Sequence, residues 1–156
     1  MRRKDKEITN PNLITEIIKA NYICRIALSD KNQPYIIPMN YGYKTNSIYL
    51  HCAKKGKKID IINKNSKVCF EITDSIEIVT ADKACGYGTR FRSVIGFGKI
   101  KQIDDTAEKA EALKIIMNQH TGSTDWNIKE SSADKLGILK IKIELVTGKI
   151  SGIEKK

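Results

Sequence analysis

The stretch ICRIALSDKNQPYIIPMNYGYKTNSIYLHC, residues 23–52, contains three apolar runs that are rich in Ile, Tyr and Leu. Two polar segments separate the runs, DKNQP at 30–34 and KTN at 44–46, and both carry residues typical of turns. This pattern predicts three antiparallel strands that follow one another in the sheet. Pro38 lies in the second run and has no N–H, so we expect it at an edge or a bulge.

Helices and further strands flank these three runs. Asn10 and Pro11 are typical of a helix start, and the helix should extend to about Asn21. A short helix is expected over 57–64, a longer one after Asp105, further strands over 67–73, 90–103 and 137–152, and a long loop over 74–89. Gly96 and Gly98 should leave a flat patch on one strand face where a backbone or a planar ligand can approach. The fold class predicted is mainly β with flanking helices, a six-stranded antiparallel split β-barrel.

The length and composition limit the possible architectures. A chain of 156 residues has the size of a single domain, which we expect to span 1–156. No apolar run reaches the ~18–20 residues of a membrane span, and no apolar segment follows the basic N-terminus, so we expect a cytoplasmic protein. The four cysteines form no C-x-x-C pair, and we interpret them as structural thiols with no metal site.

The net charge of +10 favours an anionic partner. Its densest cluster is KKGKK at 54–58, at the start of the expected short helix. Free N–H groups at a helix start favour an anion, so Gly56, Lys57 and Lys58 are candidates for a phosphate cradle; the alternative is a solvated turn. A basic barrel that binds nucleic acid needs basic and aromatic residues interleaved on an exposed sheet, so nucleic acid is the less favoured partner.

A series of seven short segments runs through the chain from its first residue to Lys149. The segments are MRRKDKEI, CRIALSD, PYIIPMNYGY, YLHCAKKGKKIDII, VCFEI, KACGYGTRFRSVIGFGKI and LVTGK. In this order they resemble the Nim-type 5-nitroimidazole resistance proteins and their flavin-nucleotide-binding relatives, within the pyridoxamine 5'-phosphate oxidase-like superfamily. RSVIGFG after KAC, together with H-x-A-x-x-G-x-K upstream, is the specific part of the resemblance.

The resemblance implies an FMN-binding split barrel that forms a homodimer with two FMN molecules at the subunit interface. It implies that the run Tyr35–Asn40 lines the flavin ring, that the end of the third strand lies beside the cofactor, and that the helix start holds its phosphate. The second subunit would contribute the segment that begins at Arg92. The implied cofactor-binding residues are Ile36, Ile37, Pro38, Met39, Asn40, Leu50, His51, Cys52, Gly56, Lys57, Lys58, Arg92 and Ser93.

The same resemblance implies the chemistry of a flavin-dependent reductase or oxidase. FMN takes hydride from a reduced nicotinamide and passes electrons to an electron-poor small molecule such as a nitroimidazole. His51 is the candidate catalytic residue, as a proton donor to the acceptor, and Arg92 would place positive charge near the ring. The alternatives are a flavin or heme-binding member without nitroreductase activity, and a deazaflavin in place of FMN. Many relatives have Ser at the position of Cys52.

Overall fold

The structure is a computed structural model that describes residues 2–153. Within this range the strands are β1 (Glu7–Ile8), β2 (Ile23–Asp30), β3 (Gln33–Lys44), β4 (Ser47–Cys52), β5 (Lys67–Val79), β6 (Gly88–Ile103) and β7 (Gly137–Ser151). The α-helices are α1 (Pro11–Ala20), α2 (Lys57–Lys64), α3 (Thr106–Thr121) and α4 (Glu130–Ala133). Two single 3-10 turns, Lys4–Lys6 and Ala84–Gly86, complete the order. None of the helices in residues 2–153 is both long and apolar enough to cross a membrane.

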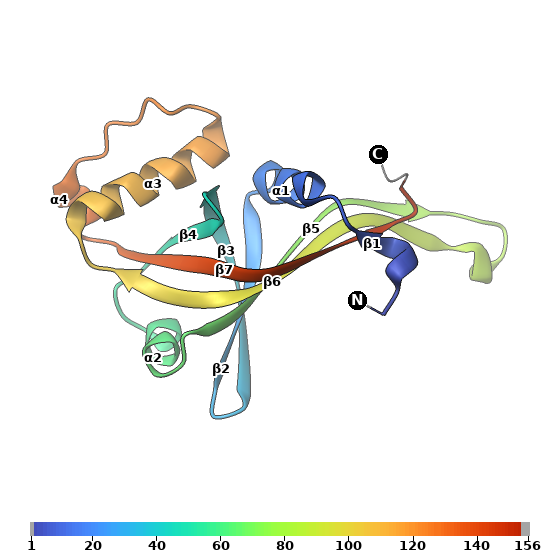
Figure 1. Cartoon of the computed structure of the whole chain (residues 1–156), viewed down its shortest axis with the longest axis horizontal. Helices are drawn as coiled ribbons and strands as arrows, with labels where there is room; N and C mark the ends of the chain where they lie inside the picture. Colours follow the sequence, from blue (N-terminus) through green and yellow to red (C-terminus); the bar gives the residue numbers. More distant parts are fainter. Residues whose placement is uncertain (1, 154–156) are drawn as a thin grey trace.

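Six strands close into an antiparallel ring. β7 pairs with β4, then β3, β2, β5 and β6 follow in order, and β6 pairs back onto β7. β1 adds to the edge of β7, and the helices lie outside the strands (Figure 1). This arrangement confirms the predicted mainly β split-barrel fold.

The three apolar runs form β2, β3 and β4 as predicted. The turns between them contain paired residues with positive φ, Lys31 with Asn32 and Thr45 with Asn46, as tight hairpins require. Residues 33–40 of β3 pair only with β2, and residues 41–44 pair with β4. Pro38 therefore lies on a strand segment that has a partner on one side only, which is the edge position that its missing N–H requires.

Alternating side chains of the ring fill its interior. Ile26, Leu50, Phe70 and Ile141 are fully buried there. The apolar face of α1 closes one end, with Ile14, Ile17 and Ile18 in the same core, while α3 covers a smaller cluster on the outside of β4, β6 and β7. The side chain of Asn10 accepts a hydrogen bond from the Asn12 N–H and caps α1, which confirms the predicted helix start.

The predicted loop over 74–89 is wrong over most of its length. β5 continues to Val79 and β6 begins at Gly88, so the two strands extend as a hairpin beyond the ring (Figure 1). Ile76 and Ile78 in this extension are 68% and 70% exposed. The run Ile76-Glu77-Ile78 alternates apolar and polar residues as strands do, but its isoleucines are exposed, so the hairpin buries no apolar face.

The expectation for Gly96 and Gly98 is also wrong, since both glycines face the interior. A Cβ on Gly96 would lie 2.2 Å from the Phe70 ring. A Cβ on Gly98 would lie 2.1 Å from the carbonyl oxygen of Lys142, beside the point where the β6–β7 register shifts. The space beside the two glycines is therefore filled by the Phe70 ring and by the backbone of β7, and no flat patch is left for a ligand.

The cysteines are free thiols in different environments. Cys24 is buried in the core, and burial raises the pKa of its thiol to about 12. Burial also raises the pKa of the half-buried Cys52 and Cys69 thiols, so these groups stay protonated near neutral pH. Residues 2–153 contain no group of three His, Cys, Asp or Glu side chains placed to hold a metal ion.

Candidate functional site

The start of α2 carries the residues predicted to hold a phosphate. Gly56 precedes the helix with a φ of 124°, a conformation that favours glycine. No side chain caps the helix start, so its first N–H groups remain free for an anion. The Lys57 Nζ lies 4.7 Å from the centroid of the Tyr35 ring, and the Lys58 Nζ lies 4.0 Å from the Met39 Sδ. Both lysine side chains are therefore held against β3.

The part of β3 that these lysines contact has a free edge. Residues 33–40 have β2 on one side and no partner strand within residues 2–153 on the other. The outward side chain of Ile36 is 64% exposed, whereas Ile37 packs against the core from the other face. A free edge offers backbone N–H and C=O groups to a ligand or a second chain. The fold thus brings the basic helix start and the predicted ring-binding run side by side.

A small hollow lies between α2 and the β2–β3 hairpin. Its volume is about 310 Å³, and its lining includes Tyr35 and Lys57. The carboxylates of Asp30 and Asp60 lie in the same lining, and the Lys64 ammonium pairs with Asp30 at 3.0 Å. Lys57 thus shares this hollow with two carboxylates, and one of them, Asp30, is already paired with Lys64.

The three predicted site residues at the end of β4 differ in how exposed their side chains are. Leu50 is fully buried in the barrel core, so only its backbone can reach a cofactor. His51 is exposed on the outer face, opposite Ile138 of β7. Cys52 is half-buried on the inner side. Of these three residues, His51 is the most exposed.

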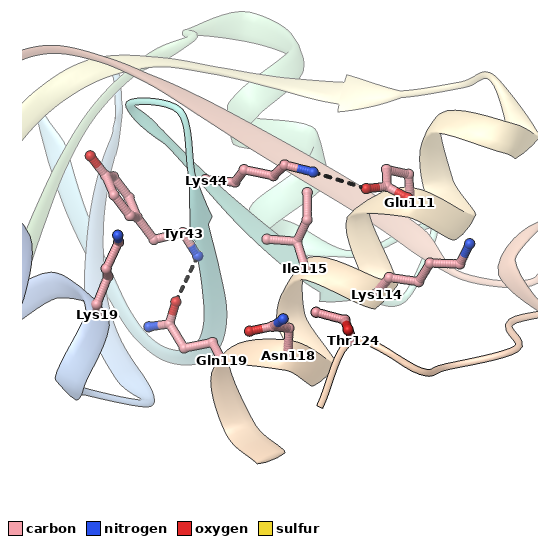
Figure 2. Close-up of a pocket in the computed structure, with 9 residues that line it drawn as sticks. All are labelled: Lys19, Tyr43, Lys44, Glu111, Lys114, Ile115, Asn118, Gln119 and Thr124. Atoms are coloured by element: carbon pink, nitrogen blue, oxygen red, sulfur yellow. Dashed lines mark hydrogen bonds and ion pairs between the residues drawn. The ribbon is translucent and has the colours of Figure 1, made fainter. Parts of the chain in front are cut away.

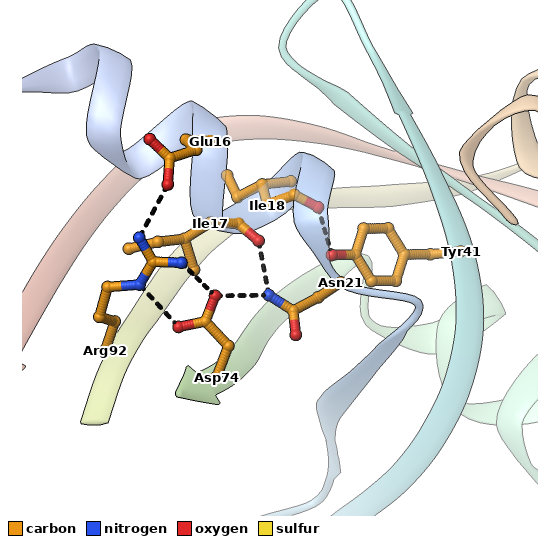
Figure 3. Close-up of polar contacts among 7 residues, drawn as sticks. All are labelled: Glu16, Ile17, Ile18, Asn21, Tyr41, Asp74 and Arg92. Carbon is orange, nitrogen blue, oxygen red and sulfur yellow. Dashed lines mark hydrogen bonds and ion pairs between the residues drawn. The ribbon is translucent and has the colours of Figure 1, made fainter. Parts of the chain in front are cut away.

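Arg92 binds two carboxylates, which the sequence reasoning missed (Figure 3). Its guanidinium donates to both oxygens of Asp74 at 2.8 Å and to Glu16 of α1 at 2.8 Å. The Asn21 amide donates to Asp74 at 3.1 Å and to the Ile17 carbonyl. Two carboxylates of the same chain thus balance the positive charge of Arg92. No local sequence pattern links Arg92 to Glu16, because tertiary packing alone brings α1 onto β6.

This ion-pair network makes an acid-sensitive contribution to stability. Partial burial would raise the pKa of Asp74, but hydrogen bonds from Arg92 and Asn21 and the charge of Arg92 outweigh it and hold the pKa below its usual value. A carboxyl group with a lowered pKa stabilises the fold above its unfolded pKa of about 4, and the contribution is lost as pH falls through the folded value. We therefore expect D74N to be less stable than the parent at pH 7, with a smaller difference at pH 3.

The measurement is urea unfolding of both proteins across that range, with D125N, an exposed carboxylate with no ion pair among residues 2–153, as the control. A stability difference between D74N and the parent that did not change with pH would contradict the network's role.

Arg92 and Ser93 lie far from α2 within one chain. α2 contacts β6 at Gln102, whose Nε2 donates to the Asn63 Oδ1 at 3.0 Å. The strand between Arg92 and Gln102 covers about 30 Å at ~3.3 Å per residue. Ser93 instead lines an outer groove of about 320 Å³ with Ile95, Thr147 and residues of the N-terminal segment. Within one chain Arg92 is therefore remote from the phosphate cradle along β6, but its Asp74 partner contacts Asn21, which is next to the residue whose carbonyl accepts from the Tyr41 N–H.

An apolar row crosses the outer face of the sheet from β7 to the free edge of β3. We call this the outer row, and its cross-strand neighbours in order are Leu145, Phe97, Cys69, Ala27 and Ile36. The exposed fractions are 59% for Leu145, 48% for Phe97 and 64% for Ile36. Contiguous exposed apolar surface of this kind marks interaction sites. The row ends at the same β3 segment that Lys57 and Lys58 contact.

A hollow of about 730 Å³ lies elsewhere, between α1, β3 and α3 (Figure 2). Gln119 closes it by accepting from the Tyr43 N–H and donating to the carbonyls of Ile18 and Asn21. Lys44 pairs with Glu111 at its rim. None of the predicted cofactor-binding residues lines this hollow, so it is separate from the candidate site.

Known proteins share the sequence pattern of this chain. The family model described as pyridoxamine 5'-phosphate oxidase matches residues 11–150. The chain belongs to this family. An uncharacterized protein of Rhizobium meliloti, RA0666, is 33% identical over 58 residues, and the match covers 37% of this chain and 38% of that protein. The match to this curated relative thus spans less than two fifths of its length.

Solved structures extend the comparison to the whole barrel. A candidate 5-nitroimidazole antibiotic resistance protein of Bacteroides thetaiotaomicron is 30% identical with a TM-score of 0.82, covering 92% of this chain and 86% of that chain. The flavocytochrome Anf3 of Azotobacter vinelandii is 16% identical with a TM-score of 0.82, over 100% of this chain and 75% of that one. An FAD and heme binding protein of Mycobacterium smegmatis is 15% identical with a TM-score of 0.84, over 97% and 76%. The last two show the shared fold, and the family resemblance is confirmed.

Proposed function

We propose that this chain is one subunit of a homodimeric FMN-dependent oxidoreductase that passes electrons from a reduced nicotinamide to an electron-poor small molecule. The observation that carries the proposal is the contact of Lys57 and Lys58, at the uncapped start of α2, with the free edge of β3. The flavoproteins among the structural neighbours support a flavin as the ligand. The Bacteroides protein supports a nitroimidazole as one acceptor.

The residues present fit a phosphorylated flavin. A phosphate ester carries nearly two negative charges at neutral pH, and the helix start offers two ammonium groups and free N–H groups at one point. The free edge of β3, with Ile36, Ile37, Pro38, Met39 and Asn40, offers backbone groups to the polar edge of a ring and apolar side chains to its face. Lys57 and Lys58 would hold the phosphate, and the β3 run would orient the ring.

When bound, FMN would supply two-electron transfer between a nicotinamide and an acceptor. The chain's own contribution would be to orient the ring and to deliver a proton. His51 is exposed at the end of β4, so its imidazole can reach an acceptor that arrives from solvent. We assign His51 the role of proton donor to that acceptor.

A second copy of the chain would complete the site. Arg92 and Ser93 are about 30 Å along β6 from the point where α2 contacts that strand. The outer row offers an apolar surface that ends beside the phosphate cradle, and we assign it to the dimer interface. Packing of two such faces would bring the Ser93 segment of one subunit toward the β3 edge of the other.

Flavin titration followed by reduction tests the function. We expect the fluorescence of FMN to be quenched on binding. FMN should bind more tightly than riboflavin, since riboflavin lacks the phosphate. Anaerobic NADH or NADPH should then bleach the bound flavin, and a nitroimidazole should restore its absorbance. Flavin that is bound but not reoxidised by the nitro compound would favour the alternative of a carrier without nitroreductase activity. Equal affinity for riboflavin and FMN would overturn the phosphate cradle.

His51→Ala should slow reoxidation of the reduced flavin by the acceptor by about a hundredfold, the usual scale of general acid catalysis, while flavin occupancy stays at the parental level. Stopped-flow absorbance of the reduced protein mixed with acceptor measures the rate. His120→Gln is the matched control, because His120 stacks against Tyr22 at the end of α3 and lies outside the site. If His51→Ala reoxidised its flavin at the parental rate, His51 would not be the proton donor.

A further inference from the structure

Two strands carry the same tripeptide, Lys-Ile-Lys, at 99–101 of β6 and 140–142 of β7. Ile100 and Ile141 are buried in the core, so the lysines on either side of them point outward. The strand register places Lys99 opposite Lys142 and Lys101 opposite Lys140, and Lys67 of β5 lies opposite Lys99. We call this surface the lysine face: Lys67, Lys99, Lys101, Lys140 and Lys142.

The lysine face is poorly balanced by acidic residues. Lys140 lies 3.4 Å from Glu108, and within residues 2–153 its other four lysines form no ion pair. Elsewhere on the surface lysines do find carboxylates, as in the pairs of Lys44 with Glu111 and Lys64 with Asp30. Like charges directly opposite each other on neighbouring strands destabilise a sheet. An anionic ligand would relieve this repulsion.

A hollow of about 540 Å³ adjoins the lysine face, a size typical of small-molecule sites. Its lining includes Lys99, Lys101, Lys140 and Lys142 together with the polar side chains of Thr45, Asn46, Ser47 and Ser66. Asn46 holds this wall in place, because its amide donates to the Ile143 carbonyl and its carbonyl accepts from the Ile143 N–H. The hollow therefore combines concentrated positive charge with polar residues on a turn that hydrogen bonds hold in place.

We propose that the lysine face is a binding site for a small anion with two or more linked phosphate groups, such as the phosphate chain of a nucleotide. Cross-strand neighbours lie about 5 Å apart and successive outward residues about 7 Å apart, so the lysines extend beyond the reach of one phosphate group. None of the residues assigned to FMN lines this hollow. The site goes beyond the proposed oxidoreductase function and does not depend on it.

Calorimetric titration with sodium tripolyphosphate and with ATP tests the site. The parent should bind both saturably, and K99Q/K142Q should bind both about tenfold or more weakly. K19Q/K114Q is the matched control, since it removes the same charge from the hollow between α1 and α3 and should bind like the parent (Figure 2). Binding of ATP but not tripolyphosphate would assign recognition to the nucleoside and overturn the assignment to the phosphate chain.

Thermal unfolding without phosphate gives a second readout. Relief of the repulsion should raise the Tm of K99Q/K142Q by about 1–4 °C above the parent, and tripolyphosphate should raise the Tm of the parent but not of this variant. Three further results would overturn the proposal: no saturable binding at about 1 mM ligand, equal loss of binding in the control, or binding of a single-stranded oligonucleotide without binding of tripolyphosphate.

Discussion

Replacing both lysines at the start of α2 with glutamate, K57E/K58E, is expected to weaken FMN binding by about a hundredfold or more. The change turns two positive charges into two negative ones at the point assigned to the phosphate. Riboflavin binding should fall much less, because riboflavin has no phosphate to repel. Fluorescence titration of the parent and the variant with both flavins measures the two effects separately.

The control for this experiment is K19E/K114E, which makes the same change in net charge at the hollow between α1 and α3. It should bind FMN like the parent. Parental FMN affinity in K57E/K58E would place the phosphate elsewhere. Equal weakening by the control would show that net charge, rather than the helix start, determines the affinity.

Phe97→Glu is expected to convert the dimer to a monomer and to release FMN at the same time. Phe97 is 48% exposed in the middle of the outer row, so a carboxylate there costs little in an isolated chain. In a dimer it would be desolvated without a partner, which is strongly unfavourable. Sedimentation or light scattering should report the mass of one chain, and the flavin absorbance should leave the protein fraction.

Tyr22→Glu is the matched control for Phe97→Glu. Tyr22 is 52% exposed and stacks on His120, away from the outer row. It should leave the dimer and its flavin intact. A dimeric Phe97→Glu protein that retains FMN would place the interface on another face. A monomeric parent that binds FMN would show that Arg92 and Ser93 of a second copy are not needed.

Most of the fold could be predicted from local sequence. The alternation of buried and more exposed residues over much of β2 and β7 follows from a sheet with one face in a core. β4 is buried on both faces, because α3 covers its outer side. Capping residues predicted helix starts correctly at Asn10 and at Asp105, whose side chain accepts from the Glu108 N–H. These features depend only on residues near one another in the chain.

The errors concern residues whose environment depends on distant segments. In the β5–β6 extension Glu77 pairs with Arg90 and Val79 with Gly88. Ile76-Glu77-Ile78 alternates as a strand does, but the partner strand lies about ten residues further along the chain. Gly96 and Gly98 lack side chains, so the sequence predicted an open patch at these positions. The Phe70 ring and the Lys142 carbonyl, from other strands, occupy the space beside them.

The candidate site divides in the same way. The KKGKK run and the edge position of Pro38 were predictable, because helix starts and proline have local chemistry. The pairing of Arg92 with Asp74 and Glu16 was not, since Glu16 is 76 residues away from Arg92. The lysine face was not either: each Lys-Ile-Lys is an ordinary alternating strand by itself, and only the register of β5, β6 and β7 combines them.

By itself the sequence determined the elements, the family and the helix start assigned to a phosphate, because periodicity, turn residues and caps act over a few residues. Only the tertiary structure decided which residues become neighbours across strands. Closure of the ring sets a single register for every strand pair, and that register aligns the outer row and the lysine face. Packing of the helices onto the ring places Lys57 against β3 and brings Glu16 to Arg92.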